Sequence, residues 1–183
     1  MKHIVKIVHL PAKEYLVING YAKLYDPGVA GDNEDIIPKR IADGSVERLK
    51  KAACSETIYI LFCNTCVRND EDKCYDCSYS IACENLSGTK NDAEFEVVRL
   101  NPCEYAMFIC EFDTETTLRD AHEKPDSLFW NEWLKENPYT SAIDDPENWT
   151  GNGFAAIEQY TPFDPDANKF TATMWYPILQ NGK

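Results

Sequence analysis

The feature that most restricts the fold of this chain is a stretch that occurs twice. Residues 5–18 and 95–108 superpose, with identical residues at equivalent positions: Val8 and Val98, Leu10 and Leu100, Glu14 and Glu104, Tyr15 and Tyr105. Residues 3–18 alternate around Pro11 in a way that is typical of a strand, a turn and a second extended segment. The repeat therefore predicts two halves that are built alike.

The first half is expected to continue with a helix and a hairpin. Apolar residues at multiples of four from Ile37 to Ala53 give one stripe to a helix over about residues 37–53, which Gly44 weakens midway. The apolar run 57–62 and the alternating run 75–83 predict two paired strands.

The second half repeats this order. A strand over residues 95–112 precedes a helix over residues 126–137, for which Asp126 is the expected N-cap and Asn137-Pro138 the stop. Strands are then expected over residues 154–160 and 170–179.

These elements predict an α+β fold made of duplicated β-α-β-β modules. We expect module one over residues 1–86 and module two over residues 93–183, within a single domain of residues 1–183. Two such modules related by a pseudo-two-fold axis would leave a central ligand cleft at their seam.

Glu158 occupies a position where an apolar residue is expected, inside the strand predicted over residues 154–160. Period-two alternation places it on one face with Ala156 and Tyr160. An unpaired buried charge is costly, so Glu158 either pairs with a basic side chain or lines a cavity for a cationic or polarised ligand. Exposure on an edge strand is the remaining alternative.

Eight aromatic residues are candidates for stacking on a ligand, although each of them could instead be a core residue. They are Tyr59, Tyr79, Tyr105, Phe108, Trp130, Trp133, Tyr160 and Trp175.

The charge of the chain argues against polyanionic partners. Its 183 residues include 18 basic and 31 acidic ones, for a net charge of −13 that repels phosphate backbones and anionic membranes. The sequence contains no Walker-type or dinucleotide-binding glycine motif, no apolar run long enough to span a bilayer and no signal peptide. We therefore expect a cytoplasmic protein that binds neither nucleic acid nor membrane directly.

Four of the eight cysteines form two C-x-x-C pairs, Cys63 with Cys66 and Cys74 with Cys77. Four thiolates suit a structural Zn²⁺ site, although about 15 to 20 residues more often separate such pairs. Reduced thiols, a redox dithiol and an iron–sulfur site are the alternatives.

The other cysteines are expected to be small core residues: Cys54, Cys83, Cys103 and Cys110. The histidines His3, His9 and His122 lack acid–histidine or metal spacing and are interpreted as surface residues.

Several segments together carry a family resemblance. Trp130-x-x-Trp133-Leu134, Pro138-Tyr139, residues 156–160 and residues 174–178 resemble the GyrI-like small-molecule-binding superfamily, which includes effector-binding domains of AraC-type and MerR-type multidrug regulators. The resemblance implies that Glu158 lies in an aromatic-lined cleft and attracts lipophilic cations. Some stand-alone members hydrolyse cyclopropane-bearing alkylating agents.

Three functions follow from these observations. The leading hypothesis is a stand-alone module that senses or sequesters a lipophilic, cationic small molecule. The second is a hydrolase in which Glu158 acts as general base on a water. The third is an acidic protein-interaction module such as a gyrase inhibitor. No helix-turn-helix segment precedes the first expected strand, so transcription regulation would require a separate regulator protein.

Overall fold

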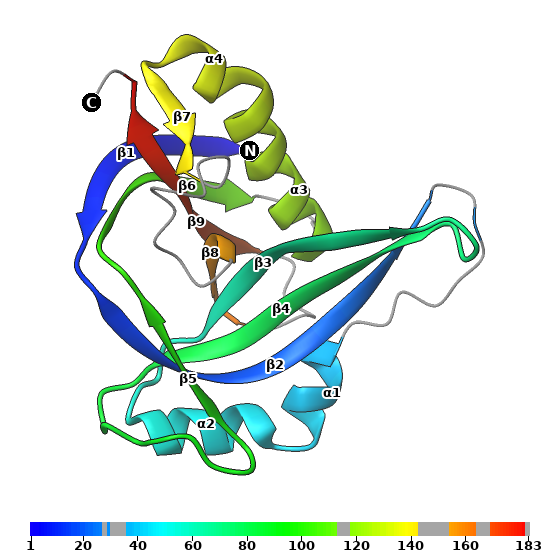
Figure 1. The fold of residues 1–183 in the computed structure, drawn as a ribbon, viewed down its shortest axis with the longest axis vertical. Helices are drawn as coiled ribbons and strands as arrows, with labels where there is room; N and C mark the ends of the chain where they lie inside the picture. Colours follow the sequence, from blue (N-terminus) through cyan, green and yellow to red (C-terminus); the bar gives the residue numbers. More distant parts are fainter. Residues whose placement is uncertain (27–28, 30–35, 113–117, 143–153, 164–168, 182–183) are drawn as a thin grey trace. The chain divides into compact units, whose positions relative to one another are not determined.

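The structure is a computed structural model that describes residues 1–26, 29, 36–112, 118–142, 154–163 and 169–181. The described residues form mostly antiparallel strands with a few helices, which confirms the predicted α+β class (Figure 1). Contacts within the chain define two compact units. Unit 1 comprises Met1–Ala12, Asn101–Gly151 and Ala155–Lys183, and unit 2 comprises Lys13–Leu100 and Asn152–Phe154.

The unit boundaries differ from those of the expected modules because strands cross between the two halves of the sequence. Strand β1 (Lys2–Leu10) pairs antiparallel with β6 (Cys103–Phe112), whereas β5 (Glu96–Leu100) pairs antiparallel with β2 (Lys13–Tyr25). The first strand of each sequence copy therefore joins the sheet that contains the second strand of the other copy. The internal duplication itself stays a prediction.

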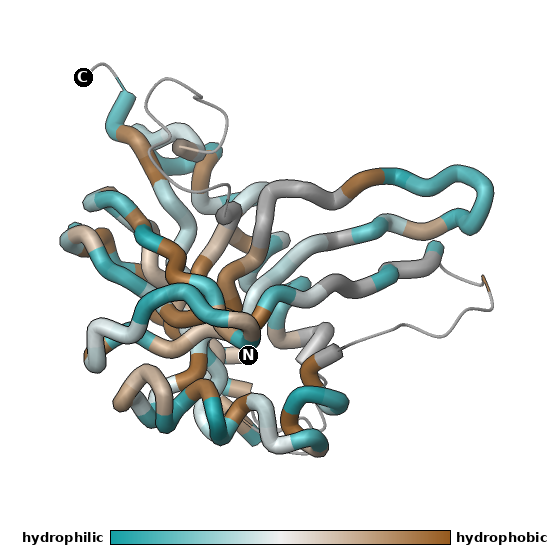
Figure 2. Tube along the Cα trace, turned by 60° about the horizontal axis from the view of Figure 1, so that its bottom comes forward, coloured by the Kyte–Doolittle hydropathy of each residue, from teal (hydrophilic) through white to brown (hydrophobic). Residues whose placement is uncertain are grey.

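Unit 2 contains a sheet in the order β3-β4-β2-β5. Strands β3 (Tyr59–Asn69) and β4 (Cys74–Glu84) form the predicted hairpin and are longer than the apolar runs that predicted them. The register shifts between Phe62 and Cys66, where a bulge interrupts the ladder. Figure 2 shows hydrophilic residues at the turn of this hairpin, which explains why hydrophobic periodicity alone stopped short of its end.

The helix predicted over residues 37–53 is broken into two. Helix α1 (Ile36–Ala42) and helix α2 (Ser45–Ala53) are separated at Gly44, which has a φ of 76° in the left-handed region that favours glycine. Helix α2 contacts β2 and β4 and buries Leu49 and Ala53 completely. The glycine therefore ends one helix and begins the next.

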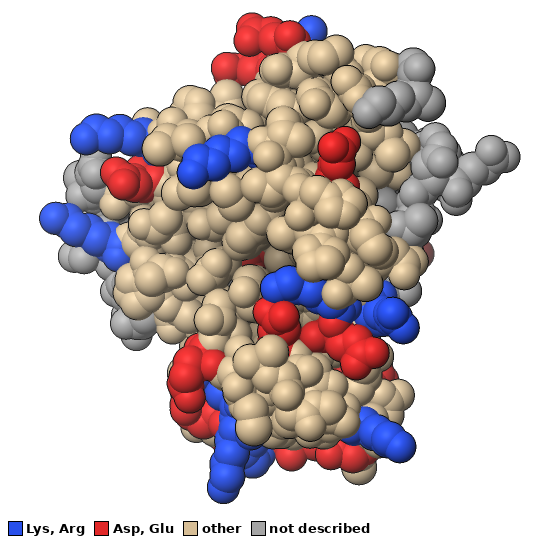
Figure 3. Space-filling view, turned by 90° about the vertical axis from the view of Figure 1, so that its left-hand side faces the viewer, with Lys and Arg blue, Asp and Glu red and all other residues tan. Residues whose placement is uncertain are grey.

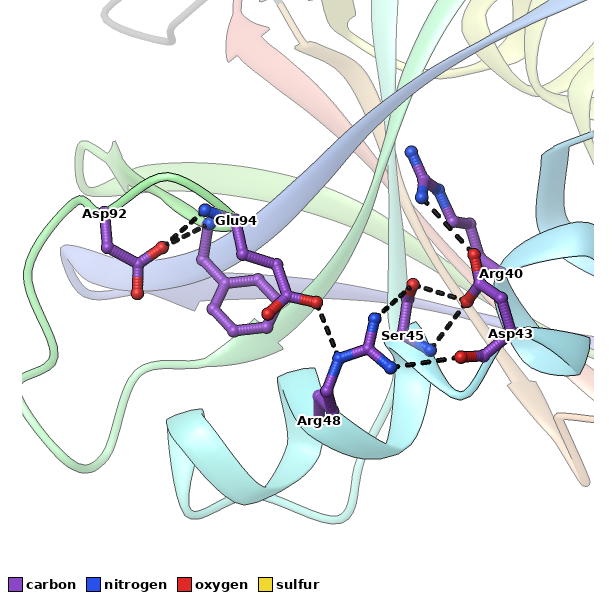
Figure 4. Close-up of polar contacts among 7 residues, drawn as sticks. Arg40, Asp43, Ser45, Arg48, Asp92 and Glu94 are labelled. Atoms are coloured by element: carbon purple, nitrogen blue, oxygen red, sulfur yellow. Dashed lines mark hydrogen bonds and ion pairs between the residues drawn. The ribbon is translucent and has the colours of Figure 1, made fainter.

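Polar contacts fix the junction between α1 and α2 (Figure 4). The Asp43 carboxylate accepts a hydrogen bond from the Ser45 backbone amide at 2.8 Å and another from the Ser45 hydroxyl. Arg48 donates to the Asp43 carbonyl at 3.0 Å and pairs with Glu94 at 2.7 Å. This side-chain cluster joins the helix start to the segment that precedes β5.

Unit 1 contains a sheet in the order β1-β6-β9-β8, in which β8 spans Phe154–Thr161 and β9 spans Phe170–Gln180. The short strand β7 (Tyr139–Ser141) pairs with the end of β9. Phe108 and Glu158 both lie opposite Met174, so these three residues share one face of the sheet.

A continuous helical segment covers that face. It consists of α3 (Leu118–Leu128), the π-helical turn η1 (Phe129–Trp133) and α4 (Leu134–Glu136). The helix predicted over residues 126–137 thus begins at residue 118, and the N-cap prediction for Asp126 is wrong. Pro125 lies buried inside α3, where packing on β6 and β9 outweighs the lost backbone hydrogen bond.

The surface shows mixed charge. On the face drawn in Figure 3, lysine and arginine side chains lie among aspartate and glutamate, and no continuous basic stripe crosses the described part of that face. None of the helices formed by the described residues has the length and apolarity needed to cross a membrane.

Candidate functional site

The carboxylate of Glu158 is buried on β8, with 3% of the residue exposed. Its Oε1 lies 2.7 Å from Nδ1 of His122 on α3, and its Oε2 accepts a hydrogen bond of 2.6 Å from the Tyr160 hydroxyl. Tyr160 is on the same strand face because it lies two residues further along β8. The expected alternative of a basic partner for Glu158 is therefore confirmed, and that partner is a histidine.

Helix α3 and turn η1 supply the other polar side of the cluster. His122, Asp126 and Trp130 follow one another at four-residue spacing, which places them on one helix face. The indole Nε1 of Trp130 donates a hydrogen bond of 3.1 Å to Asp126. The cluster between β8 and the helical segment of unit 1 thus contains two carboxylates and one imidazole. Its hydrogen-bond donors include the Tyr160 hydroxyl and the Trp130 indole.

The cluster shifts the protonation of its members. Burial disfavours the charged imidazole, but the Glu158 carboxylate, with smaller contributions from Asp126 and Glu123, outweighs burial and raises the pKa of His122 to about 9. Burial raises the pKa of Asp126, against the opposing effects of His122 and the Trp130 hydrogen bond. At neutral pH, His122 is consequently protonated and forms an ion pair with Glu158.

Tyr176 on β9 adds a buried hydroxyl that has no hydrogen-bond partner among the described residues. Burial raises the pKa of this phenol well above its usual value, and the negative charges of Asp126 and Glu158 act in the same direction. A buried polar group without a partner is costly, so the hydroxyl marks a position where a bound molecule could accept a hydrogen bond.

Stacked rings form an apolar wall next to the cluster. Phe129 stacks on Tyr176 with centroids 4.2 Å apart, and it also stacks on Trp133 at 6.0 Å. Phe108 contacts Tyr176 edge-on at 5.6 Å, and Trp133 stacks on Tyr139 at 5.6 Å. These rings hold the helical segment against the sheet, and Tyr176 also lies within electrostatic range of the Glu158 carboxylate.

The predicted ligand-contacting aromatics fall into three groups. Phe108, Trp130, Trp133 and Tyr160 lie in unit 1 on the side of the sheet that carries Glu158 and the helical segment. Tyr105 and Trp175 also lie in unit 1 but alternate onto the other face of the sheet. Tyr59 and Tyr79 belong to unit 2, where the Tyr59 ring contacts Tyr15 edge-on at 5.5 Å and Tyr79 is buried. Ligand contacts of the residues in all three groups stay predictions.

His122 is the functional candidate that sequence reasoning missed. Its interpretation as a surface residue was wrong, because its imidazole pairs with the buried carboxylate of Glu158. The four-residue spacing of His122 and Asp126 would have been informative only inside a helix, and the predicted helix began after His122. A helix extended through Pro125 would have placed the histidine on the face that carries Asp126 and Trp130.

The predicted zinc site is described only in part. The side chains of Cys63, Cys66 and Cys77 lie outside the described residues, whereas Cys74 is buried at the start of β4. In the backbone register, Cys66 lies opposite Cys77, next to the bulge of β3. Zinc binding therefore stays a prediction.

Among the other cysteines, burial confirms the core prediction for Cys83 and Cys110. Cys103 is partly exposed, and the prediction is wrong for Cys54, which is exposed.

The arrangement of strands and helices is shared with several solved structures. The chain has the α+β fold of GyrI-like effector-binding domains. No protein-family model and no curated protein matches the sequence.

Three solved structures carry this comparison of folds. The C-terminal domain of EcmrR matches with a TM-score of 0.57 at 11% identity, over 98% of this chain and 99% of that chain. SAV2435 bound to tetraphenylphosphonium matches with a TM-score of 0.51 at 14% identity, over 98% and 94%. A putative bacterial transcription regulation protein from Staphylococcus aureus matches with a TM-score of 0.52 at 14% identity, over 96% and 97%.

Proposed function

We propose that this protein binds lipophilic organic cations at the cluster around Glu158. The observation that carries the proposal is the carboxylate itself, which is buried beside stacked aromatic rings and paired with a histidine. Among the described residues, no lysine or arginine forms an ion pair with Glu158. A histidine can give up its charge when it loses a proton, whereas a guanidinium would neutralise the carboxylate permanently.

The neighbouring rings suit such a ligand in their chemistry. Each cation–π contact contributes about 0.5 to 2 kcal/mol, and it depends little on the shape of the substituents around the charge. Trp130 and Trp133, which are only partly buried, would offer such surfaces, whereas Phe108 is buried and packs against Trp133. Broad selectivity among flat or propeller-shaped cations is therefore expected.

The comparison with SAV2435 supports this ligand class. That protein shares the fold and was solved with tetraphenylphosphonium, a permanently charged cation surrounded by four aromatic rings. We carry the chemistry of this cation to the present chain because Glu158 and the rings of unit 1 provide an anion and apolar surfaces for it.

A fluorescence titration tests the proposal. Tetraphenylphosphonium should change the emission of Trp130 or Trp133 in a saturable way, and Glu158→Gln should weaken binding by about tenfold or more, which is about 1.4 kcal/mol. Glu111→Gln provides the matched control, because Glu111 is an exposed glutamate on β6 of the same unit. Equal affinity of Glu158→Gln and wild type would contradict the role of the carboxylate.

A hydrolase is the second candidate, and the pairing of Glu158 with His122 favours it. A carboxylate that accepts a hydrogen bond from a protonated imidazole forms an acid–base pair within 2.7 Å, and Tyr160 orients the second carboxylate oxygen. Glu158 would act as general base on a water that adds to a cyclopropane-bearing alkylating agent. Incubation followed by mass analysis tests this function, and the absence of a water adduct above the Glu158→Gln background removes it.

A further inference from the structure

We propose that His122 is a built-in counter-ion of Glu158 which a cationic ligand replaces, so that binding of the cation releases a proton from the imidazole. This inference rests on the proposed function and adds a mode of regulation to the same site. It makes affinity for a cation depend on pH even when the cation itself cannot titrate.

The carboxylate of Glu158 is already engaged in the free protein. Oε1 of Glu158 faces Nδ1 of His122 at 2.7 Å, and Oε2 accepts the Tyr160 hydroxyl at 2.6 Å. A cation that approaches Glu158 therefore meets a neutralised ion pair. Without a change at His122, two positive charges would share one buried carboxylate, which is strongly unfavourable in a low-dielectric environment.

Of the two partners of the Glu158 carboxylate, His122 is the one that can lose its charge. The Tyr160 hydroxyl is neutral and lies on the same strand as Glu158, so it can keep the carboxylate oriented while the other oxygen changes partner. The His122 side chain is 25% exposed, compared with 3% for that of Glu158, so the imidazole is the member of the pair that solvent reaches. Loss of this proton removes the competing charge without removing the side chain.

The charged groups that face His122 are acidic. Helix α3 contributes Asp126 and Glu123, and β8 contributes Glu158, whose other oxygen accepts the Tyr160 hydroxyl. The neutral Tyr176 hydroxyl on β9 lies within electrostatic range of Asp126 and Glu158. Burial opposes the charged imidazole, but these acidic groups, Glu158 first among them, outweigh burial and raise the pKa of His122. The imidazolium is thus the cation that these anions stabilise in the free protein, and a ligand cation is its substitute.

The expected size of the effect follows from proton linkage. The imidazole has a pKa of about 9 in the free protein. If one proton leaves when the cation binds, the affinity should rise about tenfold for each pH unit between about pH 7 and the pKa of His122 and level off above it. Affinity at pH 7 is then about one hundredth of that at high pH.

Tetraphenylphosphonium is a suitable probe because it has no titratable group. Its dissociation constant is measured by calorimetry at several pH values for wild type and for His122→Asn, whose side-chain amide can still donate toward Glu158. His9→Asn is the matched control, since His9 is an exposed histidine of unit 1. Wild type and His9→Asn should release close to one proton per ligand at pH 7, measured in buffers of different ionisation heat. His122→Asn should release none and should bind more tightly at pH 7.

Two other outcomes would overturn the inference. Saturable binding by wild type without proton release or pH dependence excludes counter-ion exchange but leaves the proposed function intact. Absence of binding by wild type and His122→Asn at pH 9.5 removes the proposed function together with this inference. If His122→Asn does not fold, NMR titration of His122 in wild type decides the question, because saturating phosphonium must lower its pKa; an unchanged pKa in the saturated complex overturns the proposal.

Discussion

The ring of Phe129 lies nearly parallel to the ring of Tyr176, with centroids 4.2 Å apart and an angle of 7° between the planes. This contact joins the π-helical turn η1 to strand β9, and both residues are almost completely buried. It holds the helical segment that carries His122 and Asp126 against the sheet that carries Glu158. The packing of an apolar pair thus determines the geometry of a polar site.

Truncation of this contact should lower stability and loosen the site. Phe129→Ala leaves a cavity beside Tyr176 and Phe108, so we expect the free energy of unfolding to fall by about 3 to 5 kcal/mol in urea denaturation. Leu86→Ala is the control, because Leu86 is 64% exposed and its loss should change stability by about 0.5 kcal/mol or less. Similar effects of both substitutions would refute the assigned packing.

The two tyrosine hydroxyls near Glu158 should differ sharply. Tyr160→Phe leaves a carboxylate oxygen of Glu158 without its donor, so it should destabilise the protein by about 1 to 3 kcal/mol. Tyr176→Phe removes a hydroxyl that lacks a partner among the described residues, so it should be neutral or slightly stabilising. Thermal melting of both variants measures the difference, and a larger loss for Tyr176→Phe would contradict the hydrogen-bond assignment.

Stability should depend on pH through His122. The folded-state pKa of His122, about 9, lies above the unfolded value of 6.5, so its contribution is complete below about pH 6.5 and is lost as the pH rises through 9. The loss between these limits should approach about 3 kcal/mol, since each pKa unit corresponds to about 1.4 kcal/mol. Urea denaturation at pH 6.5 and pH 9.5 measures it. Glu158→Gln should lack this slope, and an identical slope in that variant would exclude the pairing.

The zinc prediction can be tested independently of the Glu158 site. If the two C-x-x-C pairs bind zinc, elemental analysis under reducing conditions should find about one zinc per chain. Cys74→Ser together with Cys77→Ser should then lower zinc content and thermal stability, because metal binding would be coupled to folding of the hairpin end. Cys54→Ser is the control, as Cys54 is an exposed cysteine of the same unit. Metal-free, fully stable protein would exclude the site.

Much of the fold follows from local sequence patterns. Alternation predicted β1, β2 and the hairpin of β3 and β4, because strands with one buried face need a period of two. The exchange of β1 and β5 between the sheets of the two halves could not be predicted, since identical strand patterns suit either partner. Pairing over long sequence distances leaves no local signal.

Within the candidate site, only Glu158 and its neighbour Tyr160 were predictable from the sequence. Glu158 was evident because a carboxylate interrupts an apolar strand, and its position beside Tyr160 followed from alternation. His122 was not evident, because the predicted helix began at Asp126, whereas α3 begins at Leu118 and continues through Pro125, which brings His122 to Glu158. Tertiary packing of the rings overrides the local penalty of a proline, and this information lies in contacts between distant residues.

The measurement that tests cation binding at Glu158 most directly is the affinity for tetraphenylphosphonium at pH 9.5, where His122 is mostly neutral and no longer competes. At that pH, the difference between wild type and Glu158→Gln reports the carboxylate charge with little interference. We predict saturable binding to wild type and to Glu111→Gln, and a dissociation constant about tenfold or more higher for Glu158→Gln. Equal dissociation constants for wild type and Glu158→Gln would contradict the account.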